Sequence, residues 1–119
     1  MARYRLIHDE LQIDDGAGVV LWSGKPLSCS VTLVLPGLGG DYCVVLLDPD
    51  AKLKGAFRNL LRVSTDGVVA WRARLPTTGD DCYVSARWVD GTLVANSWSG
   101  YRVVIDSETG DIVNSTFTK

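Results

Sequence analysis

The sequence predicts an all-β domain of antiparallel hairpins, and three observations lead to this fold class. Short apolar stretches alternate with polar residues at the two-residue period of a strand. Twelve glycines and four prolines fall mostly between these stretches, as in chains of short strands and turns. Asp-Gly pairs at 66–67 and 90–91 each separate two apolar runs, and supply the positive φ that tight hairpins need.

Residues 1–48 are predicted to form the N-terminal strands of one domain that spans 1–119. Residues 4–13 alternate loosely and are expected to be a first strand, and 19–22 a second. Residues 28–35 are expected to form a strand with one apolar face. The residues that share this face are Cys29, Val31, Leu33 and Leu35. Residues 42–47 are apolar throughout, which predicts a strand buried on both faces.

The segment 49–58 carries conflicting signals. Asp48 followed by Pro49 is a good helix start, and several apolar residues recur at helical spacing. These residues are Leu53, Ala56, Phe57, Leu60 and Leu61. Gly55 lies inside that pattern and opposes a helix. We therefore expect a loop here and leave open whether it contains one helical turn.

Residues 59–119 are predicted to form three hairpins with tight turns between their strands. The expected strand pairs are 60–64 with 68–75, 82–89 with 92–97, and 101–106 with 111–117. Two of these hairpins resemble each other, because residues 61–71 align with residues 103–114 when one residue is inserted in the second turn. Their turn glycines are 43 positions apart in the numbering. A period of about 40–45 residues with four strands per unit is typical of propeller blades.

At these residues the chain resembles the β-propeller repeats of quinoprotein-type (PQQ-like) proteins. In those repeats a strand ending in Asp leads through a Thr-Gly turn to a strand with Trp four residues after the glycine. Asp106 with the Thr-Gly pair at 109–110 fits this turn, and Trp71, four residues after Gly67, fits the Trp position. Residues 90–101 are similar to the inner strands of such a blade.

The resemblance covers about 60–119 and implies blade-like hairpins. Asn114 stands at the later Trp position, so a docking contact between blades is lost there. Propellers close with about four to eight blades, more than this chain supplies. We therefore expect a compact two-layer sandwich or partly open barrel, not a closed propeller, and no quinone cofactor. The whole chain also resembles small uncharacterised bacterial proteins with comparable Ser-Trp-Ser-Gly-Tyr, Thr-Gly and Phe-Thr-Lys segments.

Composition and charge limit the binding partners and the cellular compartment that we expect for the chain. The net charge of −2 and the pI of about 5.2 disfavour nucleic-acid binding, which usually needs a basic domain. The N-terminal residues lack the apolar run of a secretory signal, and no apolar stretch approaches the length of a membrane span. The three cysteines are scattered and odd in number, which favours free thiols in a reducing cytoplasm.

No candidate for catalysis or metal binding is supported by its neighbours. His8 is the only histidine, and nothing in the sequence places a nucleophile and an orienting acid beside it. Cys43 lies in an apolar run, where burial raises a thiol pKa, and Cys82 follows two aspartates rather than cations. The aspartates at 48–50 and 80–81 lack calcium-loop spacing. We expect neither an enzyme nor a cofactor or metal site.

Arginine and aromatic residues are interleaved in the second half of the chain. Arginine stems that cover a sheet face are the simpler interpretation. The alternative is a recognition surface, because arginine, tyrosine and tryptophan are enriched at binding hot spots. The candidate binding residues are Arg72, Arg74, Arg87, Trp88, Trp98, Tyr101 and Arg102.

These observations favour a non-catalytic cytoplasmic module that binds a protein partner or a second copy of itself. A small-ligand binder with a cleft lined by arginine and tryptophan is the alternative. An exposed tryptophan favours the former, and tryptophans that line a pocket favour the latter. The last strand, 112–117, carries no charge and no proline, the usual devices that protect a sheet edge. We therefore expect a homodimer, or pairing with a partner, at that edge.

Overall fold

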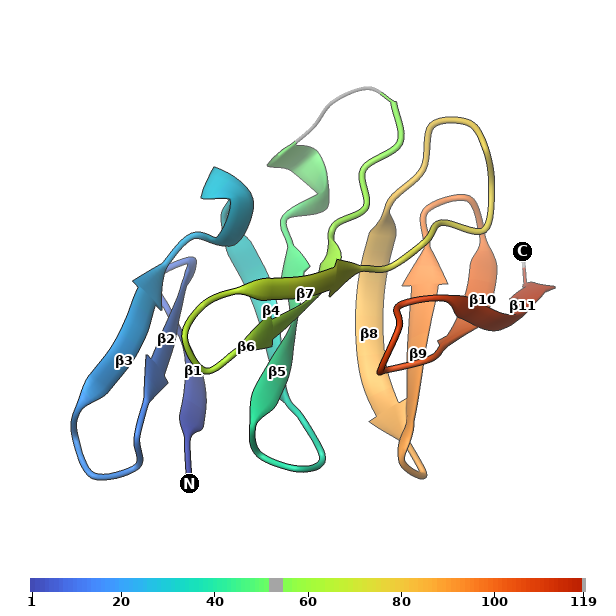
Figure 1. Ribbon diagram of the computed structural model, residues 1–119. Helices are drawn as coiled ribbons and strands as arrows, with labels where there is room; N and C mark the ends of the chain where they lie inside the picture. Colours follow the sequence, from blue (N-terminus) through green and yellow to red (C-terminus); the bar gives the residue numbers. More distant parts are fainter. Residues whose placement is uncertain (52–54, 119) are drawn as a thin grey trace.

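The computed structural model describes residues 1–51 and 55–118, and these form three antiparallel sheets (Figure 1). Two short 3-10 helices, η1 (Pro26–Ser28) and η2 (Pro49–Ala51), lie in the connections. Sheet 1 contains β1 (Arg3–Ile7), β2 (Glu10–Asp14) and β3 (Val20–Gly24). Sheet 2 contains β4 (Val31–Pro36), β5 (Tyr42–Leu47), β6 (Leu60–Ser64) and β7 (Val69–Arg72). Sheet 3 contains β8 (Tyr83–Val89), β9 (Thr92–Ser97), β10 (Tyr101–Ile105) and β11 (Ile112–Phe117).

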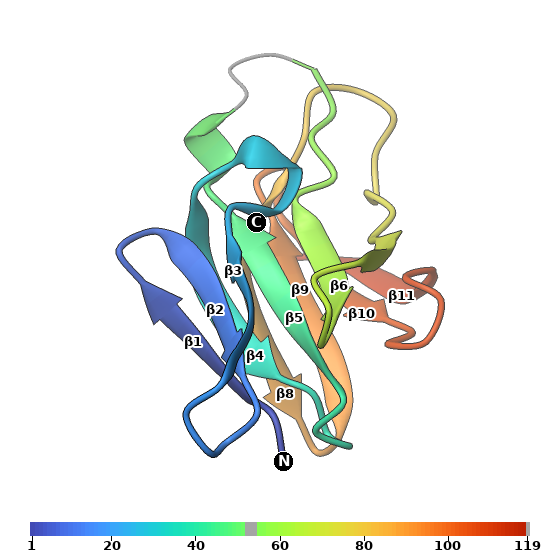
Figure 2. The ribbon, with the colours of Figure 1, turned by 60° about the vertical axis from the view of Figure 1, so that its left-hand side comes forward.

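The three sheets follow one another along the long axis of a molecule with extents of 44 × 31 × 19 Å (Figures 1 and 2). Each sheet is a simple meander in which strands that are consecutive in sequence are hydrogen-bonded neighbours. One apolar core fills the space between sheets 1 and 2, and a second fills the space between sheets 2 and 3. The all-β class with blade-like sheets is confirmed, and no closed barrel forms among the described strands.

Strand β5 runs through the middle of the molecule and serves both cores. All six of its residues are buried, as the continuous apolar run predicts. Because successive side chains point to opposite faces of a strand, its residues divide between the two cores. Tyr42, Val44 and Leu46 face sheet 3, whereas Cys43, Val45 and Leu47 face sheet 1.

The prediction of one strand over 4–13 is wrong, because a tight turn divides it into β1 and β2. His8 and Asp9 form this turn with φ angles of 48° and 55°, in the left-handed region. Asp and His enter that region more readily than most residues, but they are a weaker hairpin signal than Asp-Gly. The side chain of Asp9 stabilises the turn, since Ser30 Oγ donates to its carboxylate at 3.0 Å.

The prediction that Val31 and Leu33 share one face is also wrong. The register of β4 against β5 shifts between these two residues, so β4 contains a bulge at that point. A bulge inserts one extra residue and reverses the face of everything that follows. As a result Val31 and Val34 pack toward sheet 1, and Leu33 and Leu35 pack toward sheet 3.

The remaining segments agree with the sequence in outline. The loop after β5 begins with the single 3-10 turn η2, and Leu53 of the helical pattern lies outside the described residues. The three expected hairpins of the second half are present, although β7 ends at Arg72 instead of continuing to residue 75.

One tryptophan at each junction docks a sheet on the next. The indole of Trp71 lies on Gly110 in the turn before β11, and its Nε1 donates to Ser107 O at 2.9 Å. The indole of Trp22 in β3 lies in the same way on Gly67, in the turn before β7. Glycine lets the indole approach the backbone at both positions, because a Cβ atom there would lie within 3 Å of the ring. The tryptophan and glycine positions of the repeat are therefore the contacts that dock the sheets.

Trp22 reveals a third copy of the repeat that the sequence comparison missed. It follows Gly18 by four residues, as Trp71 follows Gly67. Sheet 1 thus corresponds to the last three strands of a four-stranded unit. Asn114, four residues after Gly110, occupies the equivalent position in sheet 3. No further sheet lies beyond it in the part of the chain that the structure describes.

Polar residues cover the two outer faces of the array. On sheet 1, Arg3 Nε and Arg5 Nη2 donate to the two carboxylate oxygens of the buried Asp14, at 3.0 and 2.7 Å. These hydrogen bonds, that from Arg5 foremost, hold the pKa of Asp14 well below its usual range. On sheet 3 the outward residues include Asn96, Arg102 and Thr116, which are opposite one another on three adjacent strands. Polar end faces of this kind do not need a further sheet to cover them, as in the terminal units of repeat proteins.

Candidate interaction site

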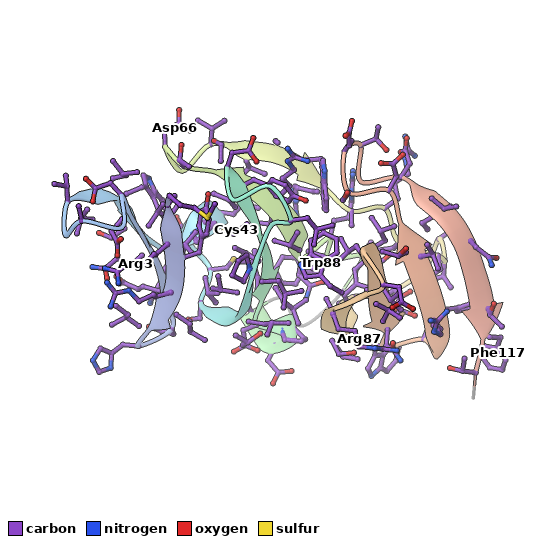
Figure 3. The ribbon with its side chains drawn as sticks, turned by 90° about the horizontal axis from the view of Figure 1, so that it is seen from below. Arg3, Cys43, Asp66, Arg87, Trp88 and Phe117 are labelled. Atoms are coloured by element: carbon purple, nitrogen blue, oxygen red, sulfur yellow. The ribbon has the colours of Figure 1, made fainter. Side chains whose placement is uncertain are left out.

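The seven predicted binding residues do not converge in one cleft. Trp88 is paired with Leu93 at one end of the β8–β9 hairpin, whereas the backbone N of Trp98 donates to Cys82 O at the other end. Figure 3 shows Arg87 and Trp88 beside β8, the strand of sheet 3 nearer to sheet 2, and Phe117 on the outer strand of sheet 3. The interpretation as a single surface lined by arginine and tryptophan is therefore not supported by their positions.

Arg72 and Arg74 make local contacts around the end of β7. Arg72 Nε donates to Arg58 O at 3.1 Å, and the guanidinium of Arg58 donates in return to Arg72 O. Arg74 Nε forms an ion pair with Asp111 Oδ1 at 2.9 Å, with both side chains more than half exposed. Exposed pairs of this kind contribute little to stability, about 0–1 kcal/mol.

A shallow hollow lies beside Arg58 and Arg74, with Leu75 and Ile112 in its lining. Its volume of about 250 Å³ is below the roughly 300–1,000 Å³ of typical ligand pockets. The two guanidiniums are already engaged with backbone carbonyls and with Asp111. The geometry therefore gives a small-ligand site limited support.

Arg87 covers apolar surface on the outer face of sheet 3. Its Nη1 donates to Asn96 Oδ1 at 3.3 Å, so the side chain crosses toward β9. Val94 stands directly opposite Arg87 and opposite Val104, and it is 1% exposed although it points away from the core. This arrangement fits the simpler interpretation, in which arginine stems shield a sheet face.

The aromatic candidates divide into packed and exposed residues. Trp88 packs against the core between sheets 2 and 3, and its Nε1 donates to Pro36 O at 3.0 Å. Trp98, in the β9–β10 turn, is 61% exposed. Tyr101 pairs with Phe117 of β11, with ring centroids 5.3 Å apart and planes inclined by 60°. Of the aromatic candidates, Trp98 has the exposure expected of a recognition surface.

The most exposed apolar feature on a strand is the outer edge of sheet 3. Strand β11 is paired with β10 on one side, and no described strand pairs with its other side. Its last five residues are exposed, including Val113 at 66% and Phe117 at 57%. Figure 3 shows Phe117 on the outer strand of sheet 3. Thr118 N donates to Gly100 O, so by antiparallel alternation Ser115 and Phe117 direct their backbone groups to the open side.

The buried polar groups have structural partners. Asn59 joins sheets 2 and 3, because its Nδ2 donates to Leu47 O and Tyr83 O while its Oδ1 accepts from Tyr83 N. The carboxylate of Asp81 accepts hydrogen bonds from Thr77, Cys82 N and Ser99. No group of three or more His, Cys, Asp or Glu residues in the described segments could hold a metal ion. Helices long and apolar enough to cross a membrane are likewise not found in those segments.

The cysteines are free in the structure. Burial raises the pKa of the Cys43 thiol to about 12, as its apolar surroundings predict. Burial, followed by the charges of Asp81 and Asp50, also raises the pKa of Cys82. Both thiols are therefore held in the unreactive protonated form near neutral pH.

Comparison with known proteins gives a family and a fold. The model of a domain of unknown function, DUF7957, matches residues 34–117. The chain belongs to this family. The DUF7957 match covers sheets 2 and 3 almost completely, from within β4 to the end of β11. No match is found among the curated proteins.

Two solved structures show where the sheets of this DUF7957 chain recur. BamB from Moraxella catarrhalis, a PQQ-like β-propeller repeat protein, superimposes with a TM-score of 0.58 at 15% identity, covering 98% of this chain and 35% of BamB. The computationally designed protein Ika8 gives a TM-score of 0.64 at 11% identity, covering 99% of this chain and 33% of Ika8. The chain thus spans about a third of each protein. The resemblance to PQQ-like repeats is supported at the level of fold.

Proposed function

We propose that this protein is a non-catalytic cytoplasmic interaction module that pairs with a second copy of itself through the open edge of β11. The observation that carries the proposal is the exposed, uncharged, proline-free strand at the outer edge of sheet 3. Such an edge offers a row of unpaired N–H and C=O groups to another strand. The cytoplasmic assignment rests on the three free cysteines, which suit a reducing compartment.

Other edge strands carry features that discourage self-pairing. Strand β1 has two arginines, β7 and β8 each have one, and β4 ends in Pro36. In a two-fold dimer identical residues approach one another, so a charge on the edge would meet its own copy. Strand β3 is also uncharged, but it is shorter than β11 and ends in Gly24. These comparisons favour β11 as the pairing strand.

The side chains of β11 suit an antiparallel pair centred on Ser115. In that register Val113 of each copy stands opposite Phe117 of the other, on the same side as the Tyr101 ring. An aromatic residue opposite a β-branched one contributes roughly 0.2–1 kcal/mol per pair. Ser115 of each copy then exchanges two backbone hydrogen bonds across the axis. The result would be one continuous eight-stranded sheet.

Light scattering on the eluting peak of a size-exclusion column tests the proposal. The chain of 12.9 kDa is expected to elute with twice that mass. Val113→Lys should give a monomer, because it places two ammonium groups beside the axis. The matched control is Val84→Lys, on the exposed bulge of β8 at the opposite edge of the same sheet, which should leave the dimer intact. A monomeric mass for the unmodified chain at every accessible concentration rejects the dimer.

A further inference from the structure

A shallow hollow opens on the outward face of sheet 1, next to the turn that joins β1 to β2. Sheet 1 stands at one end of the array, and no described sheet covers this face (Figure 1). We propose that the hollow binds a neutral sugar of the size of a monosaccharide. The residues that line it are Ile7, His8, Glu10, Leu11, Gln12 and Ser23.

The strand register brings these side chains to one face of the sheet. Ile7 stands opposite Glu10, and Gln12 stands opposite Ser23. Glu10 and Gln12 are two positions apart on β2, so their side chains point to the same side. Leu11 lies between them and packs into the core from the opposite face. Three adjacent strands therefore contribute polar or apolar side chains to the same hollow.

The turn that carries His8 is held in place by the connection from β3 to β4. Val31 N donates to Asp9 O at 2.8 Å, Ser30 Oγ donates to the Asp9 carboxylate at 3.0 Å, and Lys25 Nζ lies 3.5 Å from that carboxylate. His8 and Asp9 both have φ angles in the left-handed region. Non-glycine residues keep this conformation only where their surroundings hold it, and such residues are concentrated at binding sites. The rim of the hollow is thus ordered before a ligand arrives, which lowers the cost of binding.

The polar side chains of the hollow are available to a ligand. Elsewhere on the same face the polar groups bind one another, since Arg3 and Arg5 donate to Asp14. At the hollow, by contrast, four polar side chains form no hydrogen bond or ion pair with another described residue. They are those of His8, Glu10, Gln12 and Ser23.

The chemistry of these groups suits hydroxyls. The carboxylate of Glu10 accepts hydrogen bonds, whereas the amide of Gln12 and the hydroxyl of Ser23 both donate and accept them. A sugar hydroxyl also donates and accepts, so it can pair with each of these groups. Ile7 is 38% exposed and offers an apolar contact to the C–H groups of a sugar ring. An apolar surface with a few convergent polar groups is the usual composition of a ligand site.

The charge and the volume of the hollow limit the ligand further. The ionisable residues on the outward face of the three strands are Arg3, Arg5, Glu10 and Asp14, and their formal charges sum to zero. Glu10 at the hollow disfavours an anion, and the arginines on the same face disfavour a cation. The volume of about 270 Å³ lies just below the roughly 300–1,000 Å³ of typical ligand pockets, which suits one sugar ring.

NMR and calorimetry with D-glucose, D-galactose and D-mannose test the proposal. Saturation-transfer-difference spectra should detect binding of at least one of these sugars, with a dissociation constant of about 1 mM or lower by calorimetry. The uronate and the 2-amino form of the same sugar should each bind at least about tenfold more weakly. Addition of the sugar should shift the backbone amide signals of residues 7–12 and 23.

Variants test the assignment to this hollow. Gln12→Leu and Ser23→Ala each remove hydrogen-bonding groups and should weaken binding about threefold or more. Ser85→Ala is the matched control, because it removes an exposed strand hydroxyl from β8 and should leave the affinity unchanged. Thermal unfolding establishes that each variant is folded, and Glu10→Gln replaces either hollow variant that is not.

Val113→Lys should bind the sugar as the unmodified chain does, which separates this site from the β11 edge. The proposal is overturned if none of the three sugars binds, or if the charged forms bind as tightly as the neutral sugar. Amide shifts confined to another part of the molecule, or unchanged affinity in the folded hollow variants, would overturn it as well.

Discussion

Replacing Trp71 by alanine should remove the contact that holds sheet 3 against sheet 2. The indole is 8% exposed, lies against Gly110, and donates from Nε1 to Ser107 O at 2.9 Å. Truncation of a buried tryptophan to alanine typically costs about 3–5 kcal/mol of the free energy of unfolding. Domains of this size have only about 5–15 kcal/mol in total, so the loss would be a large fraction of it.

A more conservative change separates packing from hydrogen bonding. Trp71→Phe keeps an aromatic ring over Gly110 but lacks the indole N–H. Ser107 O retains a hydrogen bond from Arg62 Nη1 at 2.9 Å, so no carbonyl is left without a partner. We expect Trp71→Phe to cost about 1 kcal/mol for the lost hydrogen bond, with a further contribution from the smaller ring. Trp71→Ala should be clearly the more destabilising of the two.

Urea unfolding followed by far-UV circular dichroism measures these differences without relying on tryptophan emission. Trp98→Ala is the matched control, because it removes the same side chain from a site that is 61% exposed. Surface substitutions of this kind usually change the free energy of unfolding by less than about 0.5 kcal/mol. If Trp71→Ala costs no more than Trp98→Ala, the docking role of Trp71 is refuted.

Three further predictions concern the turns, the loss of stability at acidic pH and the thiols. Gly67→Ala should destabilise the fold, because its Cβ would meet the ring of Trp22 at 2.3 Å at a positive φ, whereas Gly79→Ala, with open space around it, should be near neutral in the same urea assay. The lowered pKa of Asp14 means that its stabilising ion pairs are present above about pH 4 and are lost as the pH falls, so the unfolding free energy of Asp14→Asn should depend less on pH below that value. Unreduced, denatured protein should titrate with three thiols, and Cys43 should be protected from alkylation in the folded state; a single thiol would indicate a disulfide and contradict the cytoplasmic assignment.

The sequence predicted part of the candidate site. The uncharged last strand predicted an unprotected edge, and the structure places β11 at the edge of sheet 3. The interleaved arginines and tryptophans left open whether they shield a sheet face or form a recognition surface, and the structure does not bring all of them together in one cleft. Arginine in a strand serves equally to shield a sheet face or to bind a partner, and the neighbouring strands decide between these roles. The division of residues 4–13 into β1 and β2 was missed, because the turn at His8 and Asp9 was not recognised.

Local physics explains what the sequence determined by itself. Alternation of apolar residues, continuous apolar runs and Asp-Gly turns act within a few residues, so the all-β class, β5 and the three later hairpins were predicted correctly. The bulge in β4 was decided by the tertiary structure. A single inserted residue reverses the faces on which the following side chains lie, and the composition of the strand does not indicate it. The docking of the sheets was decided there too. Trp71 reaches an acceptor 36 positions away and Trp88 one 52 positions away, and contacts of that length arise only when the chain has packed its sheets together.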